Sequence, residues 1–232
     1  IASCLVGSEM CIRDRHISEI GLCSGHSASG VWVDEHAATT VSGLYAAGDL
    51  ACVPHNYMLG AFVYGKLAGE SAAQRCAEIE LADVDEAQVE LERKRVWAPL
   101  EKKDGLPPSQ VEYKLRRMVN DYLQPPKVTR KMEIGLTRFE AIRADLENIS
   151  AAGPHELMRA MEVHAIRDCA EMAARASLYR TESRWGLYHN RVDFPERNDE
   201  DWFVHVQVKK VDGAMTCFKR PIAPYILSLI HI

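Results

Sequence analysis

The sequence lacks several features that would identify a binding site at once. Its 14 glycines form no G-x-G-x-x-G loop after an apolar segment, so the usual opening of a dinucleotide-binding site is absent. Its seven cysteines form no C-x-x-C pair, which argues against an iron–sulfur cluster or a zinc site within this chain. No apolar run approaches the roughly 18 residues that a membrane-spanning helix needs. We therefore predict no metal site and no direct membrane span.

The composition is ordinary for a globular protein. The 232 residues fit one or two domains, with 47% hydrophobic and 26% charged residues. The formal net charge of −5 gives no general attraction to nucleic acid or to an anionic membrane. Scattered cysteines without a pairing motif favour reduced, mostly buried thiols in a cytoplasmic protein.

The two ends of the chain differ in character from the rest. The stretch "CLVGSEMCIRDR" at 4–15 and the stretch "LSLIHI" at 227–232 resemble translated sequencing-adapter read-through. The alternative is a genuine terminal strand and tail. We interpret residues 1–15 and 227–232 as artefactual and leave them out of the fold prediction.

Three regions lie between these ends. Residues 16–77 have α/β texture, because short apolar segments at 30–33 and 43–47 are separated by turn residues and precede a small-residue helix. Residues 78–105 are charge-dense and are either a helix or a solvated connector. Residues 106–226 are mostly helical. The predicted fold class is α/β, as in the closing half of a Rossmann-like nucleotide-binding domain, followed by an α-helical bundle.

Helix signals are strongest in the middle of the third region. Residues 107–124 begin with proline at a first-turn position and stop at Pro125-Pro126. Residues 129–149 and 153–180 repeat apolar side chains at spacings of three and four. The two stripes are Met132, Leu136, Phe139, Ile142 and Leu146, and then Leu157, Met161, Ala165, Cys169, Met172 and Ala176. Three amphipathic helices with short connections predict an antiparallel bundle with both stripes in its core.

The stretch "TESRWGLYHNRVDFPERNDEDWFVHVQVKK" interleaves aromatic residues with arginines and acids. Alternation from Trp202 to Val208 predicts a strand. The basic cluster of Arg184, His189 and Arg191 can bind an anion through its guanidinium groups. It can equally form a structural ion-pair network with Glu182, Asp193 and Glu196, and the residues alone favour that reading.

The best candidate site follows the apolar segment 43–47. There Gly48-Asp49 puts a carboxylate where a strand ends, the edge at which α/β folds bind ligands, and it can accept hydrogen bonds from sugar or ribityl hydroxyls. The next helix directs free N–H groups at an electron-rich ligand atom, and Gly60 and Ala61 allow close approach. An ordinary helix N-cap is the alternative. Separately, His26 in "SGHSASGVWV" can bind an anionic substrate or transfer a proton, although a lone loop histidine is usually a surface residue.

These stretches carry a family resemblance. "TTVSGLYAAGDLA" with "LGAFVYGKLAGESAA" resembles the second FAD-binding segment of the succinate dehydrogenase/fumarate reductase flavoprotein family. "HELMRAMEV" and "ESRWGLYHNRVDFPERNDEDW" resemble the C-terminal helical domain of that family. Together with "SGHSASGVWV", they are most similar to the branch of adenylylsulfate reductase alpha subunits. The similarity covers roughly residues 20–225.

The resemblance implies a cofactor and several roles. The phosphate loop of the family lies near the start of a much longer chain, so we expect this sequence to be a fragment that begins after it. By the resemblance, Gly48 and Asp49 form the turn that binds the ribityl chain of FAD. The helix start that contacts the isoalloxazine ring corresponds to Leu59, Gly60 and Ala61, and His26 corresponds to the substrate-facing histidine.

One position departs from the family pattern. Dicarboxylate enzymes carry "NRLG", whose arginine clamps the substrate, whereas this chain has "YMLG" with Met58 in that place. A thioether cannot replace a fork of charged donors, so succinate and fumarate are doubtful substrates. Adenylylsulfate reductases also lack that arginine, but their flavin segment differs from "CVPHNYMLGAFVYG". Another substrate is therefore possible, with Tyr57 and Arg184 as candidate binding residues.

We accordingly expect the carboxyl-terminal part of an FAD-dependent oxidoreductase, inactive as a fragment. It would move electrons between a small anionic substrate and an iron–sulfur, ferredoxin-like partner. The first alternative is an adenylylsulfate reductase alpha subunit acting with AMP and sulfite. An alternative of another class is a non-catalytic helical interaction module.

Overall fold

The computed structural model describes four stretches of the chain, 30–53, 57–80, 83–184 and 189–222. They fall into two compact units, residues 1–84 and 85–232, each of which is described by itself. The segments interpreted as artefactual, 1–15 and 227–232, and the candidate His26 lie outside the described residues.

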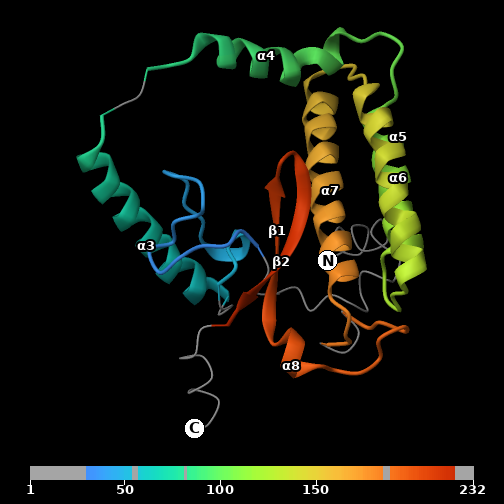
Figure 1. The fold of residues 1–232 in the computed structure, drawn as a ribbon. Helices are drawn as coiled ribbons and strands as arrows, with labels where there is room; N and C mark the ends of the chain where they lie inside the picture. Colours follow the sequence, from blue (N-terminus) through green and yellow to red (C-terminus); the bar gives the residue numbers. More distant parts are fainter. Residues whose placement is uncertain (1–29, 54–56, 81–82, 185–188, 223–232) are drawn as a thin grey trace, which may run out of the picture. The chain divides into compact units, whose positions relative to one another are not determined.

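The first unit is built on one long helix. Helix α3 spans Tyr57–Glu78, in agreement with the helix predicted from the sequence (Figure 1). A short 3-10 turn, η1, spans Gly48–Leu50 and packs against α3. A small core forms around them from Val33, Ala46, Ala51 and Val53, with Tyr64 of α3 packed against it.

The strands predicted at 30–33 and 43–47 form no sheet within the described residues. Val31 pairs with Ala51 in a single parallel bridge, and Ala38 pairs with Tyr45 in a single antiparallel one. A parallel sheet needs neighbouring strands and covering helices, and these residues supply one helix only. The structure therefore does not show the predicted Rossmann-like remnant.

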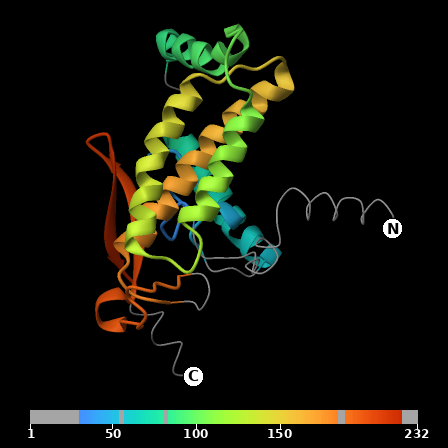
Figure 2. The same ribbon diagram turned by 90° about the vertical axis from the view of Figure 1, so that its right-hand side faces the viewer.

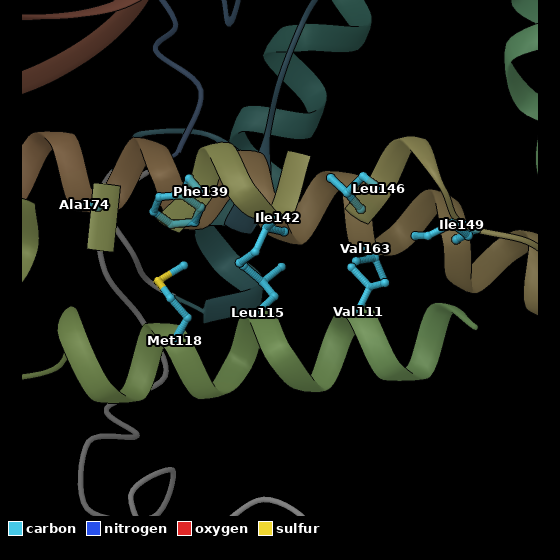
Figure 3. Close-up of a cluster of buried hydrophobic side chains, with 10 residues drawn as sticks. Val111, Leu115, Met118, Phe139, Ile142, Leu146, Ile149, Val163 and Ala174 are labelled. Carbon is cyan, nitrogen blue, oxygen red and sulfur yellow. The ribbon is translucent and has the colours of Figure 1, made fainter. Parts of the chain in front are cut away.

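The second unit contains the predicted three-helix bundle. Helices α5 (Pro108–Tyr122), α6 (Thr129–Glu147) and α7 (Pro154–Tyr179) contact one another pairwise. Figure 2 shows the three side by side. Ten buried apolar side chains form their common core, including Leu115, Phe139 and Ile142 (Figure 3).

Only one of the two predicted apolar stripes lies in this core. Met132, Phe139, Ile142 and Leu146 of α6 are buried, as expected. On α7, Leu157 of the predicted stripe is buried as expected, but the other buried positions are Ala160, Val163, Arg167, Glu171 and Ala174. Ala165, Cys169 and Met172 of the predicted stripe are exposed, so that part of the prediction is wrong. The cause is that α7 carries apolar residues on two sides, and the sequence does not say which side meets α5 and α6.

The charge-dense region contributes helix α4 (Glu86–Glu101) to the second unit. Asp85 caps it by accepting hydrogen bonds from the N–H groups of Ala87 and Gln88. Its surface ion pairs, such as Arg93–Glu90, join residues three or four apart.

The aromatic tail forms a turn of helix and a hairpin. Helix α8 spans Asp199–Trp202, and strands β1 (Val204–Val211) and β2 (Ala214–Pro221) pair antiparallel. The predicted strand therefore begins two residues later than expected, because Trp202 ends α8 and packs its buried ring edge-on against Tyr179. Strand β2 was missed, although Asp212-Gly213 is a typical hairpin turn and both residues have positive φ.

The thiols do not follow the prediction that most of them are buried. Among the described cysteines, Cys76 and Cys169 are exposed, whereas Cys52 and Cys217 are half-buried. Small helical side chains become exposed when their side of the helix has no neighbour, which sequence spacing does not reveal. Within the same residues, no helix is both long and apolar enough to cross a bilayer.

Candidate functional site

The first candidate site lies where the Gly48-Asp49 turn meets α3. The turn is held by its neighbours: the Val31 N–H donates to the Leu50 carbonyl at 2.7 Å and the Cys52 N–H donates to the Val31 carbonyl at 2.8 Å. Gly30 permits this approach, because a Cβ there would lie 2.3 Å from the Leu50 carbonyl oxygen. The backbone of 30–33 is thus fixed beside the residues that follow Asp49.

A second contact fixes the turn against the helix. Gly48 has a φ of +66°, a conformation that glycine adopts without strain. A Cβ placed on Gly48 would lie 3.5 Å from the Cβ of Ala61. The structure therefore brings three predicted residues together, with Gly48 and Asp49 on the turn and Ala61 one turn into α3.

The loop before the turn is tied to the far half of α3. The Asp34 carboxylate accepts hydrogen bonds from the N–H groups of His36 and Ala38, both at 2.9 Å. The Arg75 guanidinium of α3 donates to the Ser42 hydroxyl at 2.9 Å. These contacts orient the segment that enters Gly48, and sequence inspection did not single out Arg75 because it lies far from the predicted turn.

The arrangement can bind a polar ligand that carries hydroxyls and an electron-rich edge. Asp49 lies on this turn and is exposed. The first turn of α3 contains Tyr57, Leu59 and Gly60, and the first four N–H groups of an α-helix lack partners within it. Gly60 and Ala61 carry no bulk that would block access to that backbone. His55 and Asn56, which precede α3, lie outside the described residues.

A second candidate site surrounds Glu182 in the helical unit. This fully buried carboxylate accepts hydrogen bonds from Arg180 at 2.5 Å, from Arg184 at 2.7 Å and from the Asn198 N–H at 2.8 Å. Burial alone would raise the pKa of Glu182, but these hydrogen bonds and the arginine charges outweigh burial and lower it. Arg184 also donates to Asp199 at 2.6 Å. The guanidinium predicted to bind substrate is thus shared between two carboxylates of its own chain.

Arg191 is the most saturated side chain of this region. Its fully buried guanidinium donates to Asp193, to Thr129 at the start of α6, and to the carbonyls of Ser177 and Arg180 at the end of α7. These bonds cap the last turn of α7, whose final carbonyls lack helical partners. They also hold the pKa of Asp193 well below its ordinary value. Of the three acids predicted to pair with the basic cluster, Glu182 binds Arg184 and Asp193 binds Arg191. The backbone carbonyl of Glu196 instead accepts a hydrogen bond from the Ser183 N–H.

Two further basic groups lie against Arg191. Burial, with the charge of Lys127, lowers the pKa of His189 to about 4. Burial, with the charge of Arg191, lowers the pKa of Lys127 to about 8. The Lys127 ammonium donates to the Ser177 hydroxyl at 2.8 Å. Lys127 was not predicted, because it lies some sixty residues from the arginine motif and only the fold brings it there.

The cluster is therefore a structural ion-pair network that holds its own segments together. Its arginines are matched by carboxylates and carbonyls of the same chain, which favours the structural alternative given by the sequence. Among the described residues, no group of three or more histidine, cysteine, aspartate or glutamate side chains could hold a metal ion. The Gly48-Asp49 turn, whose Asp49 is exposed, is the better candidate for a ligand site.

Comparison with known proteins adds a third line of argument. The family of fumarate reductase flavoprotein C-terminal domains matches residues 112–227, half of the chain. The fumarate reductase flavoprotein subunit of Mycobacterium tuberculosis is 30% identical over 207 residues, which cover 80% of this chain and 35% of that protein.

Solved structures resemble the chain as well. Adenylylsulfate reductase from Archaeoglobus fulgidus superposes with a TM-score of 0.76 at 30% identity, over 81% of this chain and 33% of that one. Sdh1 of Mycobacterium smegmatis superposes with a TM-score of 0.73 at 26% identity, over 88% and 37%. The chain thus spans about a third of the length of the proteins that it matches.

Proposed function

The chain belongs to the fumarate reductase flavoprotein family, and on that basis we propose that it is the carboxyl-terminal part of an FAD-dependent oxidoreductase. The first unit would supply half of the flavin site, and the helical unit would be the C-terminal domain. The observation that carries the proposal is the Gly48-Asp49 turn, which packs against α3 with the small side chain of Ala61 opposite Gly48.

The residues of this corner fit FAD. Asp49 is exposed and can accept hydrogen bonds from ribityl hydroxyls. The amino-terminal N–H groups of α3, near Leu59 and Gly60, favour an electron-rich ligand edge. When bound, FAD exchanges two electrons with a substrate and passes them on singly. The chain's own part is to hold the ribityl chain and to present backbone donors to the ring.

The substrate side of the proposal rests on fewer residues. A small anionic substrate agrees with His26, which would bind it or supply a proton, and with Tyr57 as a lining residue. Met58 is 70% exposed, and its thioether offers no charged donor at the position where dicarboxylate enzymes carry arginine. We leave Arg184 out of the substrate site, because Glu182 and Asp199 already accept its hydrogen bonds.

The electron acceptor or donor on the other side would be an iron–sulfur protein. This part of the proposal rests on the family membership, because fumarate reductase flavoprotein subunits work with iron–sulfur subunits. Stopped-flow reduction of the full-length flavoprotein, with and without its iron–sulfur partner, would test it. A flavin that exchanges no electrons with that partner would contradict the assignment.

Adenylylsulfate reduction is the competing activity, and the similarity to the Archaeoglobus fulgidus enzyme favours it. The assay is electron transfer that depends on both AMP and sulfite in the full-length protein. Activity with both compounds would replace the general proposal by this specific one. Activity with another anion and none with AMP and sulfite would exclude it.

The alternative of another class is a helical interaction module without flavin. Two observations favour it: the helical unit has its own hydrophobic core, and its buried Arg191 is hydrogen-bonded within the chain. An absorption spectrum of the purified full-length protein separates the two, since bound flavin gives a visible band. A colourless full-length protein would support the module and contradict the oxidoreductase.

Asp49→Ala in the full-length protein tests the flavin corner directly. A hydrogen bond to a charged group contributes about 1.5–3 kcal/mol, so the dissociation constant for FAD should rise roughly ten- to a hundredfold. Glu35→Gln removes another exposed carboxylate of the first unit and serves as the matched control, with unchanged flavin binding. Full flavin occupancy in Asp49→Ala at limiting FAD would remove Asp49 from the site.

A further inference from the structure

Tyr64 of α3 packs against the segments that flank the Gly48-Asp49 turn. It is the α3 side chain that packs against the small core of the first unit, which consists of Val33, Ala46, Ala51 and Val53. Ala46 precedes the turn and Ala51 directly follows it. Tyr64 therefore connects α3 to the chain on both sides of the turn.

Side-chain packing joins this turn to the helix. The backbone hydrogen bonds from Leu50 and Cys52 go to Val31, so they hold the turn against another loop and do not involve α3. On the α3 side, the small side chain of Ala61 lies opposite Gly48. Tyr64 follows Ala61 by three residues and therefore lies on the same side of the helix.

Tyr64 has the side chain best suited to set a spacing here. Its neighbours Phe62 and Val63 are 67% and 48% exposed, whereas Tyr64 is half-buried. The buried members of the cluster are valines and alanines, so Tyr64 supplies its one aromatic ring among the described residues. An aromatic ring is large and stiff, and its removal leaves a cavity into which neighbours move.

This spacing matters because the two proposed FAD contacts lie on different elements. Asp49 lies on the turn, and the free N–H groups lie at the start of α3. A displacement of about 1 Å between binding groups strongly weakens what they do together. We propose that Tyr64 is a positioning residue of the flavin corner, whose ring sets the spacing between the turn and α3. This inference rests on the proposed function, because it concerns the same FAD site.

The midpoint potential of the bound flavin tests this role in the full-length protein. Donors at the start of α3 favour the reduced, more electron-rich flavin, so moving them away should make the potential more negative. The measurement is a spectroelectrochemical titration at saturating FAD. We expect a more negative potential in Tyr64→Ala and the wild-type potential in Tyr64→Phe, which keeps the ring.

Saturating FAD separates positioning from stability. A variant that is only less stable still binds FAD in the native geometry once it is folded, so its potential would be that of the wild type. The dissociation constant gives a second readout, and it should rise roughly tenfold in Tyr64→Ala, as for one lost hydrogen bond to the ligand. Tyr64→Phe should bind FAD as tightly as the wild type does.

Phe62→Ala is the matched control, because it removes an exposed ring two residues away on the same helix. Its flavin potential should equal that of the wild type. A wild-type potential in Tyr64→Ala, or the same shift in Phe62→Ala, would overturn the positioning role. If Tyr64→Ala does not fold, Tyr64→Leu gives the comparison, because leucine keeps the apolar contact but not the flat ring.

The same measurements distinguish this inference from the proposed function. If Asp49→Ala weakens FAD binding while Tyr64→Ala behaves as the wild type, the flavin site stands and the role of Tyr64 is wrong. If Tyr64→Ala shifts the potential while Asp49→Ala keeps full affinity, Tyr64 positions a flavin that Asp49 does not hold. A full-length protein that binds no flavin would contradict both.

Discussion

Among the described residues, ten buried apolar side chains form the core of the helical unit and four form the core of the first unit. The polar contacts differ in the same direction. In the helical unit the fully buried Arg191 bridges two helices. In the described part of the first unit, Arg75 donates one hydrogen bond to the exposed Ser42. Met58, Phe62 and Leu50 of the first unit remain more than 60% exposed.

The difference suggests separate roles, with the helical unit contributing stability and the first unit contributing binding groups. In the helical unit, the buried carboxylate of Glu182 and the buried guanidinium of Arg191 are both hydrogen-bonded within the chain. The described part of the first unit presents an exposed carboxylate, a turn with positive φ and the start of a helix. Binding groups are commonly placed on loops beside a more rigid scaffold.

The sharpest test of the contrast removes one arginine from each unit. Arg191→Ala leaves Asp193 without its main partner and uncaps the carbonyls of Ser177 and Arg180. Breaking a buried ion pair costs about 3–5 kcal/mol, so we expect the helical unit to lose about 4 kcal/mol. Arg75→Ala, which removes one exposed hydrogen bond, should cost under about 1 kcal/mol.

Denaturant unfolding followed by peptide-level hydrogen exchange measures both variants, because it reports each unit separately. Equal losses in the two variants would mean that Arg191 is no more important than a surface arginine. The ion-pair network around Arg191 would then contribute little to the stability of the helical unit.

A pair of methionines tests the apolar side of the same contrast. Met132 of α6 is fully buried, whereas Met58 of α3 is 70% exposed. Met132→Ala should cost about 3 kcal/mol, from lost burial and the cavity that remains. Met58→Ala should change stability by less than about 0.5 kcal/mol. A thermal melt of each variant gives the comparison, and a large loss in Met58→Ala would show that the first unit buries more than the structure indicates.

Much of the helical unit could be predicted from sequence. Pro108 at the start of α5 and the regular stripe from Met132 to Leu146 are local signals, and they located α5 and α6 to within two residues. Helix α7 was located equally well, but its buried face was not. Arg167 and Glu171 are buried as an ion pair at 2.5 Å, and a charged pair inside a core is not expected from periodicity.

The candidate site was predictable only as a set of residues. Gly48, Asp49 and Ala61 followed from the turn and the family resemblance, and the structure brings them together. Their surroundings depend on contacts between distant segments, such as Tyr45 with Ser71 and Val31 with Leu50. Lys127 and His189 meet for the same reason, since nothing in either local sequence indicates the other.

The smallest expected effect is that of pH on the helical unit, through the buried His189. The pKa of His189 is about 4 in the folded chain, against 6.5 for an ordinary histidine, since burial and then the charge of Lys127 disfavour its protonation. Above pH 6.5 His189 is neutral in both the folded and the unfolded chain, so its contribution to stability is fully present.

As the pH falls from 6.5 towards 4, His189 becomes protonated in the unfolded chain but stays neutral in the folded chain, so the free energy of unfolding falls. At about 1.4 kcal/mol per pKa unit, the loss near pH 4.5 should be about 2.5 kcal/mol relative to His189→Gln, whose amide can still donate to the Arg180 carbonyl. Denaturant unfolding of both proteins from pH 7.5 to 4.5 measures this difference, and parallel curves would show that His189 is protonated as easily in the folded chain as in water.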